Sequence, residues 1–203
     1  MSHTQDFFTS RNNNQVGTNY INQNGRLWYD PDTNTIRVNN GSPGGRLVFG
    51  GYHSTFYDIT SQPMANISLA QQVQFANIAS NTGVGLTNNS IQFIYPGQYL
   101  VQFSLQFVNN GNEQYDINVW FRKNNQDMDW TNSIFTIPAR KSVGVPGKLI
   151  AVTPFIDGWY NENDTIQIMW HADSTNVSIE TIGPQTNPTI PGAPGVIITI
   201  NQV

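Results

Sequence analysis

The chain has 203 residues, among them 26 asparagines, 16 glutamines and no cysteine, so disulfides, thiol catalysis and iron–sulfur clusters are excluded. Its formal net charge is −4 with nine lysines and arginines, which argues against a non-specific nucleic-acid binder and against a polybasic membrane binder. Aromatic residues make up 12% of the chain, enough apolar mass to fold, and no apolar run reaches the roughly 18 residues of a transmembrane helix.

Residues 1–48 form a polar tract rich in asparagine and glycine, and its start lacks the basic and apolar segments of a Sec export signal. Segments 26–29 and 35–38 are predicted to pair as a hairpin, because Asp30 and Pro31 suit the first positions of a type I turn. Such a tract cannot bury a core alone. We therefore predict an extended arm that attaches to its own globular part, a sister subunit or a larger assembly through Phe7, Phe8, Leu27, Trp28, Tyr29 and Val38.

The globular part is predicted to begin at residue 49. Between Ala65 and Ser80, four large apolar residues stand at odd positions, Ile67, Leu69, Val73 and Phe75, which indicates a strand rather than a helix. The clearest alternation spans residues 98–107, where aromatic and aliphatic residues alternate mainly with glutamine and serine, directly after the turn signal Pro96-Gly97. This segment is predicted to be a strand with one buried face.

Further alternating segments lie at residues 117–122, 166–170, 177–180 and 195–200, with asparagine-rich turns and a proline-rich loop at 184–194 between them. No other segment offers a convincing helix. Short strands separated by turn signals indicate an all-β sandwich or barrel over residues 49–203.

No catalytic motif stands out in the sequence. The three histidines, His3, His53 and His171, share no recognisable spacing. The Asp127-Met128-Asp129 segment could hold a cation, but it lacks the further oxygen ligands and the placed glycine of a calcium loop. We expect no enzyme activity, no cofactor and no metal, although a cation on a symmetry axis between subunits stays open.

Six aromatic residues gather in one third of the chain, and one of them, Trp120, lies on the polar face of its predicted strand, opposite Val119 and Phe121. Such a cluster can cap the end of a sandwich core, form a subunit interface, or stack on carbohydrate. The pattern leaves these three interpretations open for Trp120, Trp130, Phe155, Trp159, Tyr160 and Trp170.

Several motifs together resemble one family. The segment Pro96-Gly97-Gln98-Tyr99 with its alternating strand resembles the signature of the C1q/TNF-like jelly roll. The strand over 117–122 with its Lys-Asn turn, the Thr-Asn-Ser segment at 131–133, the Asp-led strand at 163–170 and the terminal strand at 194–203 follow in the family's order. Gly195 departs from the serine that many relatives carry there. The residues of these motifs, and of the segments 25–30, 35–38 and 41–45, resemble those of tailed-phage, cyanophage-type virion proteins.

The resemblance implies a ten-strand, two-sheet antiparallel jelly roll that forms a homotrimer. It implies a non-enzymatic virion protein, assembled in the host cytoplasm, that binds the major capsid protein or other virion proteins and neither nucleic acid nor membrane. We expect a trimeric capsid decoration (cement) protein; the alternative is a receptor-binding or adhesin head of a tail or neck fibre, which would contact glycan. Candidates for the trimer interface or core are Tyr99, Phe103, Phe107, Trp120 and Trp170.

Overall fold

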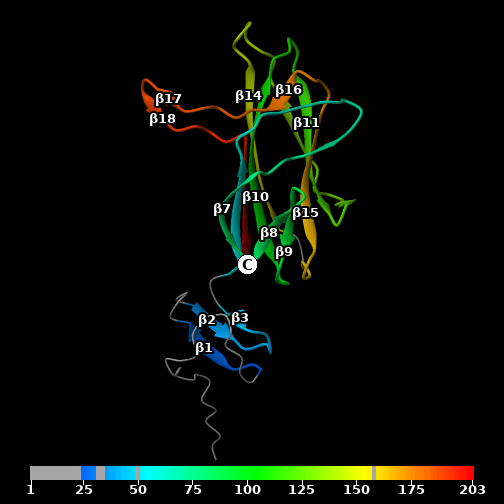
Figure 1. The fold of residues 1–203 in the computed structure, drawn as a ribbon. Coiled ribbons are helices and arrows are strands. Elements are labelled where there is room, and N and C mark those ends of the chain that lie inside the picture. Colours follow the sequence, from blue (N-terminus) through cyan, green and yellow to red (C-terminus); the bar gives the residue numbers. More distant parts are fainter. Residues whose placement is uncertain (1–23, 31–34, 49–50, 157–158) are drawn as a thin grey trace, which may run out of the picture. The chain divides into compact units, whose positions relative to one another are not determined.

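The chain divides into two units, Met1–Gly51 and Tyr52–Val203, close to the predicted boundary (Figure 1). The computed structural model describes residues 24–30, 35–48, 51–156 and 159–203. These ranges contain strands and loops without a helix, which confirms the all-β prediction. No helix in them is long and apolar enough to cross a bilayer. Phe7 and Phe8 lie outside the described residues.

The N-terminal unit contains a small antiparallel sheet of three strands in the described ranges, β1 (Leu27–Asp30), β2 (Thr35–Val38) and β3 (Arg46–Leu47). The predicted hairpin is confirmed, with Leu27 opposite Val38. The third strand was not predicted, and the tract is therefore not an extended arm throughout. Arg37 holds the sheet together: its Nε lies 3.2 Å from Asp30, and Nη1 donates to the Gly44 carbonyl oxygen at 2.9 Å.

The larger unit consists of two main antiparallel sheets arranged like a sandwich, seven strands each among the described residues. The first, here called the β10 sheet, has the order β5-β16-β10-β19-β4-β7, with β14 paired to the other edge of β10. Its strands are β4 (His53–Asp58), β5 (Gln62–Pro63), β7 (Asn77–Thr82), β10 (Tyr99–Asn109), β14 (Gly147–Ile156), β16 (Val177–Ile179) and β19 (Val196–Gln202).

The second sheet, here called the β15 sheet, has the order β12-β11-β15-β9-β8, with β13 paired to β11 and β6 paired to β15. Its strands are β6 (Gln71–Gln72), β8 (Val84–Thr87), β9 (Ser90–Phe93), β11 (Tyr115–Lys123), β12 (Gln126–Asp127), β13 (Ser133–Ile137) and β15 (Thr165–Ala172). The alternating segments predicted around residues 98–107, 117–122, 166–170, 177–180 and 195–200 all form strands.

The strand count exceeds the ten that the resemblance implies, because short strands share one edge of a longer strand. Along β10, β19 pairs with residues 99–105 and β16 with residues 107–109. Along β11, β12 and β13 divide one edge in the same way, and β6 and β9 divide one edge of β15. Among the described residues, each sheet is therefore four or five strands wide, depending on the level.

The core lies between the two sheets, where the odd-numbered residues of β10 face those of β11 and the even-numbered residues of β15. Phe103 contacts Phe121 with ring centroids 5.8 Å apart, and Phe107 contacts Trp170 at 5.5 Å. These aromatic side chains are buried, and each contributes on the order of 2–3 kcal/mol by leaving water. The period-two pattern of the sequence therefore places the core correctly.

The strand predicted over residues 65–80 is wrong for most of its length. The chain there forms a loop that pairs with a sheet at Gln71–Gln72, and β7 begins at Asn77. Val73 and Phe75 are buried, whereas Ile67 and Leu69 are exposed. Val73 and Phe75 stand at odd positions because they reach the core from a loop. A period of two alone cannot distinguish such a loop from a strand.

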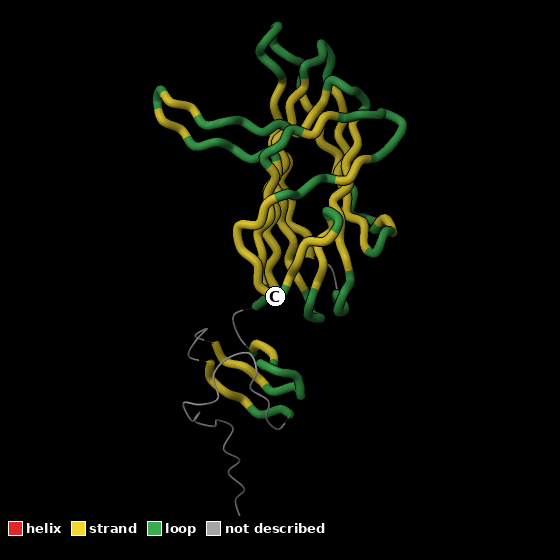
Figure 2. Tube along the Cα trace, viewed as in Figure 1, coloured by secondary structure: helices red, strands yellow, loops and turns green. Residues whose placement is uncertain are grey.

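The predicted proline-rich loop contains a hairpin of β17 (Gln185–Thr186) and β18 (Thr189–Ile190), which projects away from both sheets (Figure 2). Its base is the bridge between Ile182 and Ala193. Directly after it, Gly195 is required by close approach: a Cβ there would lie 2.9 Å from the Glu180 carbonyl oxygen. This close approach gives the physical reason for glycine at position 195.

Candidate functional site

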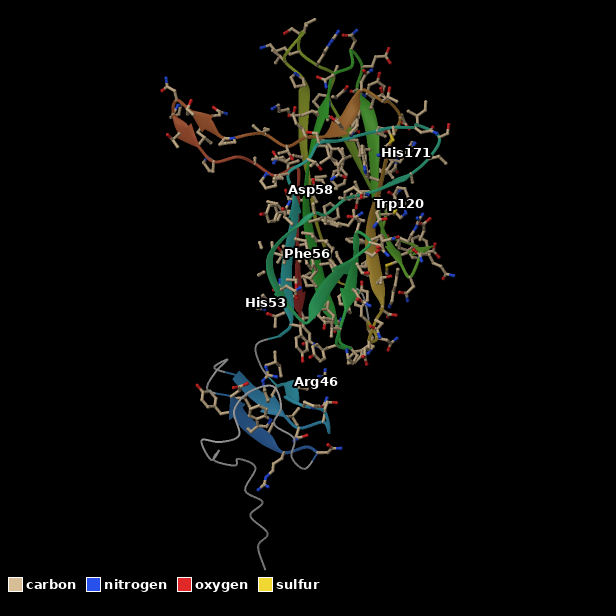
Figure 3. All side chains as sticks on the ribbon, in the orientation of Figure 1. Arg46, His53, Phe56, Asp58, Trp120 and His171 are labelled. Atoms are coloured by element: carbon tan, nitrogen blue, oxygen red, sulfur yellow. The ribbon has the colours of Figure 1, made fainter. Side chains whose placement is uncertain are left out.

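A pocket of about 420 Å³ lies on the outer face of the β15 sheet. Trp120 on β11 and His171 on β15 both contribute to it (Figure 3). The alternation of β11 turns Trp120 outward because Val119 and Phe121 face the core. We call this site the tryptophan pocket; its lining residues are Asn118, Trp120, Asp127, Met128, Asp129, Trp130, Asn132 and His171.

One wall of the pocket is the segment 127–132, which follows a tight hairpin. Asn124 and Asn125 form the two-residue turn between β11 and β12 with φ of 48° and 65°, the left-handed values that such hairpins need. The wall is fixed to β11 because the Met128 N–H donates to the Phe121 carbonyl oxygen at 3.0 Å. In return, the Phe121 N–H donates to Thr131 Oγ1 at 3.1 Å.

Asp127 orients the Trp120 side chain. The indole Nε1–H of Trp120 and the Nε–H of Arg122 both donate to Asp127 Oδ1, each at 2.8 Å. The hydrogen bond from Arg122, followed by that from Trp120, holds the pKa of Asp127 below its ordinary value of 3.8. Asp127 is therefore a carboxylate at neutral pH, and its hydrogen bond with Nε1 fixes the orientation of the Trp120 indole.

Trp130 is the most unusual residue of the pocket. Its exposed fraction is 101%, the highest among the exposed large hydrophobic residues, and its backbone has φ of 68°. A bulky side chain rarely takes this left-handed conformation, because its Cβ then crowds the backbone. The indole consequently stands in water at the rim of the pocket on a strained residue.

Amide and imidazole groups complete the lining. The Asn132 Nδ2 donates to Asn118 Oδ1 at 2.9 Å, and His171 Nε2 donates to the Ile67 carbonyl oxygen at 2.8 Å. Aromatic surface beside carboxylates and amides can bind a polar ligand that has an apolar face. In the described ranges, no three His, Asp or Glu side chains gather as a metal site would require.

The predicted core or interface residues divide between two locations. Tyr99, Phe103, Phe107 and Trp170 are buried in the sandwich, whereas Trp120 is half-buried on its outer face. In the N-terminal unit, Trp28 is buried, with the Arg37 guanidinium 5.9 Å from its ring centroid. Leu27 and Val38 are half-buried, and Tyr29 is exposed.

Sequence reasoning singled out Trp120, Trp130 and Asp127 without bringing them together. The signals were a tryptophan on the polar face of a strand and an Asp-x-Asp segment in a turn-rich stretch. Nothing in the sequence connected them to His171, which lies opposite Asn118 in the pairing of β11 with β15. Of the other aromatic residues in the cluster, Tyr160 is buried in the core and Trp159 is exposed outside the pocket.

A second surface lies on the outer face of the β10 sheet. Across four strands, Val152 lies opposite Ser104, Ser104 opposite Ile197, and Ile197 opposite Tyr57. Ile150, Val152 and Ile197 are 60%, 59% and 38% exposed. We call this the uncharged face; it consists of Thr55, Tyr57, Gln102, Ser104, Ile150, Val152, Ile197 and Thr199.

No family model matches the chain, and no curated protein is significantly similar to it. What the structure establishes is an all-β protein with two main antiparallel sheets and a small N-terminal sheet. Its function must therefore be argued from the tryptophan pocket and the uncharged face.

Proposed function

We propose that the protein is a non-enzymatic structural component of a phage virion, a homotrimeric capsid decoration protein. The observation that carries the proposal is the uncharged face, a run of apolar, amide and hydroxyl side chains over four adjacent strands. The assignment to a virion and the trimeric state both come from the family resemblance. The uncharged face supports self-association, and the separate N-terminal unit supports attachment to another virion protein, such as the major capsid protein.

We infer that the sandwich is a jelly roll of the C1q/TNF-like kind. Its long strands support this, since β14, β10, β19 and β4 are neighbours in one sheet and β13, β11, β15 and β9 in the other. The chain passes from one sheet to the other between β10 and β11, between β13 and β14, and between β14 and β15. Such repeated crossing is typical of two interleaved Greek keys.

The composition of the uncharged face favours a buried interface. Interface cores are depleted in charged residues, because a charge that loses water there must find a partner. Lys148, which lies on the same side of β14 as Ile150 and Val152, borders this face and is paired with Glu180, whose Oε2 lies 3.7 Å from its Nζ. A second copy packed against Ile150, Val152 and Ile197 would remove exposed aliphatic surface from water, at about 25 cal/mol per Å².

The projecting hairpin of β17 and β18 also supports assembly. A two-stranded hairpin without further packing is marginal in water, and residues 183–192 are all exposed. Both of its ends lead into the β10 sheet, from β16 and into β19. In a homotrimer the hairpin would contact the neighbouring subunit and gain the packing that its own subunit does not supply.

The attachment step is tested by truncation. A chain lacking residues 1–51 should keep its number of subunits, because the sandwich contains its own core, but it should no longer bind purified virions. Tyr29→Asp in the full chain is the finer variant, since Tyr29 is exposed in the small sheet. Normal binding of the truncated protein to virions would overturn the attachment role of the N-terminal unit.

The alternative function, a receptor-binding or adhesin head on a tail or neck fibre, is favoured by the tryptophan pocket, which is open to solvent and aromatic. Copy number separates the two functions. Quantitative mass spectrometry of purified virions should give hundreds of copies per particle for a capsid decoration protein. Three to a few tens of copies would place the protein on a neck or tail instead.

A further inference from the structure

We propose that the tryptophan pocket binds one neutral pyranose unit of a surface glycan, with the Trp130 indole stacked on the sugar ring. The inference does not depend on where in a virion the protein sits, since a decoration protein and a fibre head could both carry such a site. It rests on the state of Trp130, on the polar groups around it and on the rigidity of the pocket wall.

Trp130 combines two unfavourable features that folding alone does not require. Its indole is fully exposed, and its backbone is left-handed. Another residue, such as glycine or asparagine, would take this conformation with less strain and expose no apolar ring. Strained residues that persist at a pocket rim are expected where the side chain is presented to a ligand.

The surrounding groups select the chemistry of that ligand. The indole face is the negative side of the aromatic quadrupole, and the C–H groups on one face of a pyranose carry the complementary partial charge. The hydroxyls of the same sugar donate and accept hydrogen bonds, which suits the Asp129 carboxylate and the Asn118 and Asn132 amides. A purely apolar partner would cover these polar groups without satisfying them, at a cost in binding.

The charge of the pocket favours a neutral sugar over an acidic one. Asp127 and Asp129 both line it, and Arg122 forms an ion pair with Asp127 through Nε. Asp129 lines the same pocket as Trp130 and would repel a uronate or sialate carboxylate bound there. A neutral hexose meets no such penalty.

The wall of the pocket is held by hydrogen bonds within the chain. These bonds join β11 to the segment 128–131, and Asp127 orients the Trp120 indole. The pocket's volume of about 420 Å³ falls within the range of roughly 300–1,000 Å³ for small-molecule sites. Binding therefore requires little ordering of the protein, although an open site of this kind holds a single sugar weakly.

Saturation-transfer difference NMR on the full chain tests the proposal. The probes are maltotriose, cellotriose, mannotriose and triacetylchitotriose as neutral trisaccharides, and trigalacturonate as the acidic one, each up to about 10 mM. We expect at least one neutral trisaccharide to bind with a Kd on the order of 1 mM, more tightly than trigalacturonate. Absence of binding by all four neutral probes, or tighter binding of trigalacturonate, would overturn the proposal.

Two variants locate the site. Trp130→Gly removes the ring and relieves the strain of the left-handed backbone, so the variant should fold. Its Kd for the bound trisaccharide should rise roughly tenfold or more. Trp159→Ala is the matched control, because Trp159 is another exposed tryptophan, 57% accessible and outside the pocket lining. Its Kd should stay within about twofold.

The remaining outcomes contradict the proposal in distinct ways. Equal loss of affinity in both variants would mean non-specific stacking on exposed indoles, and retained affinity in Trp130→Gly would place the sugar elsewhere. If no sugar binds and Trp130→Gly instead abolishes attachment to virions, Trp130 is a protein contact and the glycan site is wrong. That last result would leave the structural role of the protein intact, so the two proposals fail separately.

Discussion

The two outer faces of the sandwich differ in chemistry although both belong to antiparallel sheets of similar width. The uncharged face is a run of apolar, amide and hydroxyl side chains, with Val152 and Ile197 on either side of Ser104. The opposite face carries a pocket in which tryptophan, aspartate and asparagine meet. A surface without charge is suited to another protein surface, whereas a pocket with oriented polar groups is suited to a small polar ligand.

The difference follows from what covers each sheet. The segment 127–132 folds back over β11 and builds the pocket wall, while the longest connection next to the β10 sheet, the β17–β18 hairpin, projects away from the sandwich. One face is thus partly covered by its own chain, whereas the segment 180–195 leaves the other uncovered. The following variants test this division, from the largest expected effect to the smallest.

Charges on the uncharged face should have the largest effect. In the double variant Val152→Glu with Ile197→Glu, each subunit would bury unpaired carboxylates on association, at a cost of several kcal/mol. Both side chains are exposed in the single chain, so the fold should remain. Sedimentation equilibrium should show monomers, with Trp130→Gly on the other face still oligomeric. An unchanged mass for the double variant would show that the uncharged face is not the interface.

Gly195→Ser, directly before β19, should destabilise the sandwich by about 1–3 kcal/mol, because the serine Cβ would press on the Glu180 carbonyl group. Gly183→Ser is the matched control: a Cβ there meets nothing within 4 Å, so stability should be unchanged. Urea unfolding measures both variants. Equal midpoints would mean that the strands separate enough to accept serine, and that the close approach does not explain the glycine.

Trp120→Phe should cost about 1 kcal/mol, since it removes the hydrogen bond to Asp127 and keeps most of the ring's contact with the sheet. The oligomeric mass should not change, because Trp120 lies on the pocket face. Trp159→Phe serves as the control, as no comparable bond is lost. If Trp120→Phe dissociates the oligomer, the pocket face rather than the uncharged face is the subunit interface.

Acidification should have the smallest effect. The pKa of Asp127 is lowered by its bonds to Arg122 and Trp120. Burial raises the pKa of Asp164. Hydrogen bonds from the Asn124 side chain and the Asn161 N–H, together with Lys123, lower it by a larger amount, so the net shift is downward. Because both pKa values are depressed on folding, the stabilisation is present above the ordinary value of 3.8 and is lost as pH falls through the folded values.

Each carboxylate should contribute less than about 1 kcal/mol, since both are screened by solvent. Thermal unfolding from pH 6 down to pH 2 should therefore show a shallower loss of stability in the double variant Asp127→Asn with Asp164→Asn than in the parent chain. Identical slopes would mean that the two ion pairs contribute nothing to the folded state.

Much of the fold could be predicted from the residues. Period two identified β10, β11, β15, β16 and β19, and Asp30-Pro31 identified the β1–β2 hairpin. These patterns are local, because a strand with one buried face repeats every second residue whatever its partner. The segment at 65–80 shows the limit: Val73 and Phe75 are buried from a loop, and alternation alone does not reveal whether a chain pairs.

The sites required more than local pattern. Trp120 could be singled out because it lies on the polar side of its strand. His171, which lines the same pocket, is 51 residues further along the chain and comes close to Trp120 only through the pairing of β11 with β15. The uncharged face likewise combines β4, β10, β14 and β19, none of which is unusual by itself. Strand order, which decides both surfaces, is a non-local property.

By itself the sequence determined an all-β chain with a polar N-terminal tract, a low charge and an aromatic core, because composition and period two act residue by residue. Tertiary structure alone decided that Trp120 and Trp130 share a pocket with Asp129, and that Val152 and Ile197 share a face. The physical reason is that side chains distant in sequence become neighbours through backbone hydrogen bonds between strands, and the order of those strands is chosen by the packing of the whole sandwich.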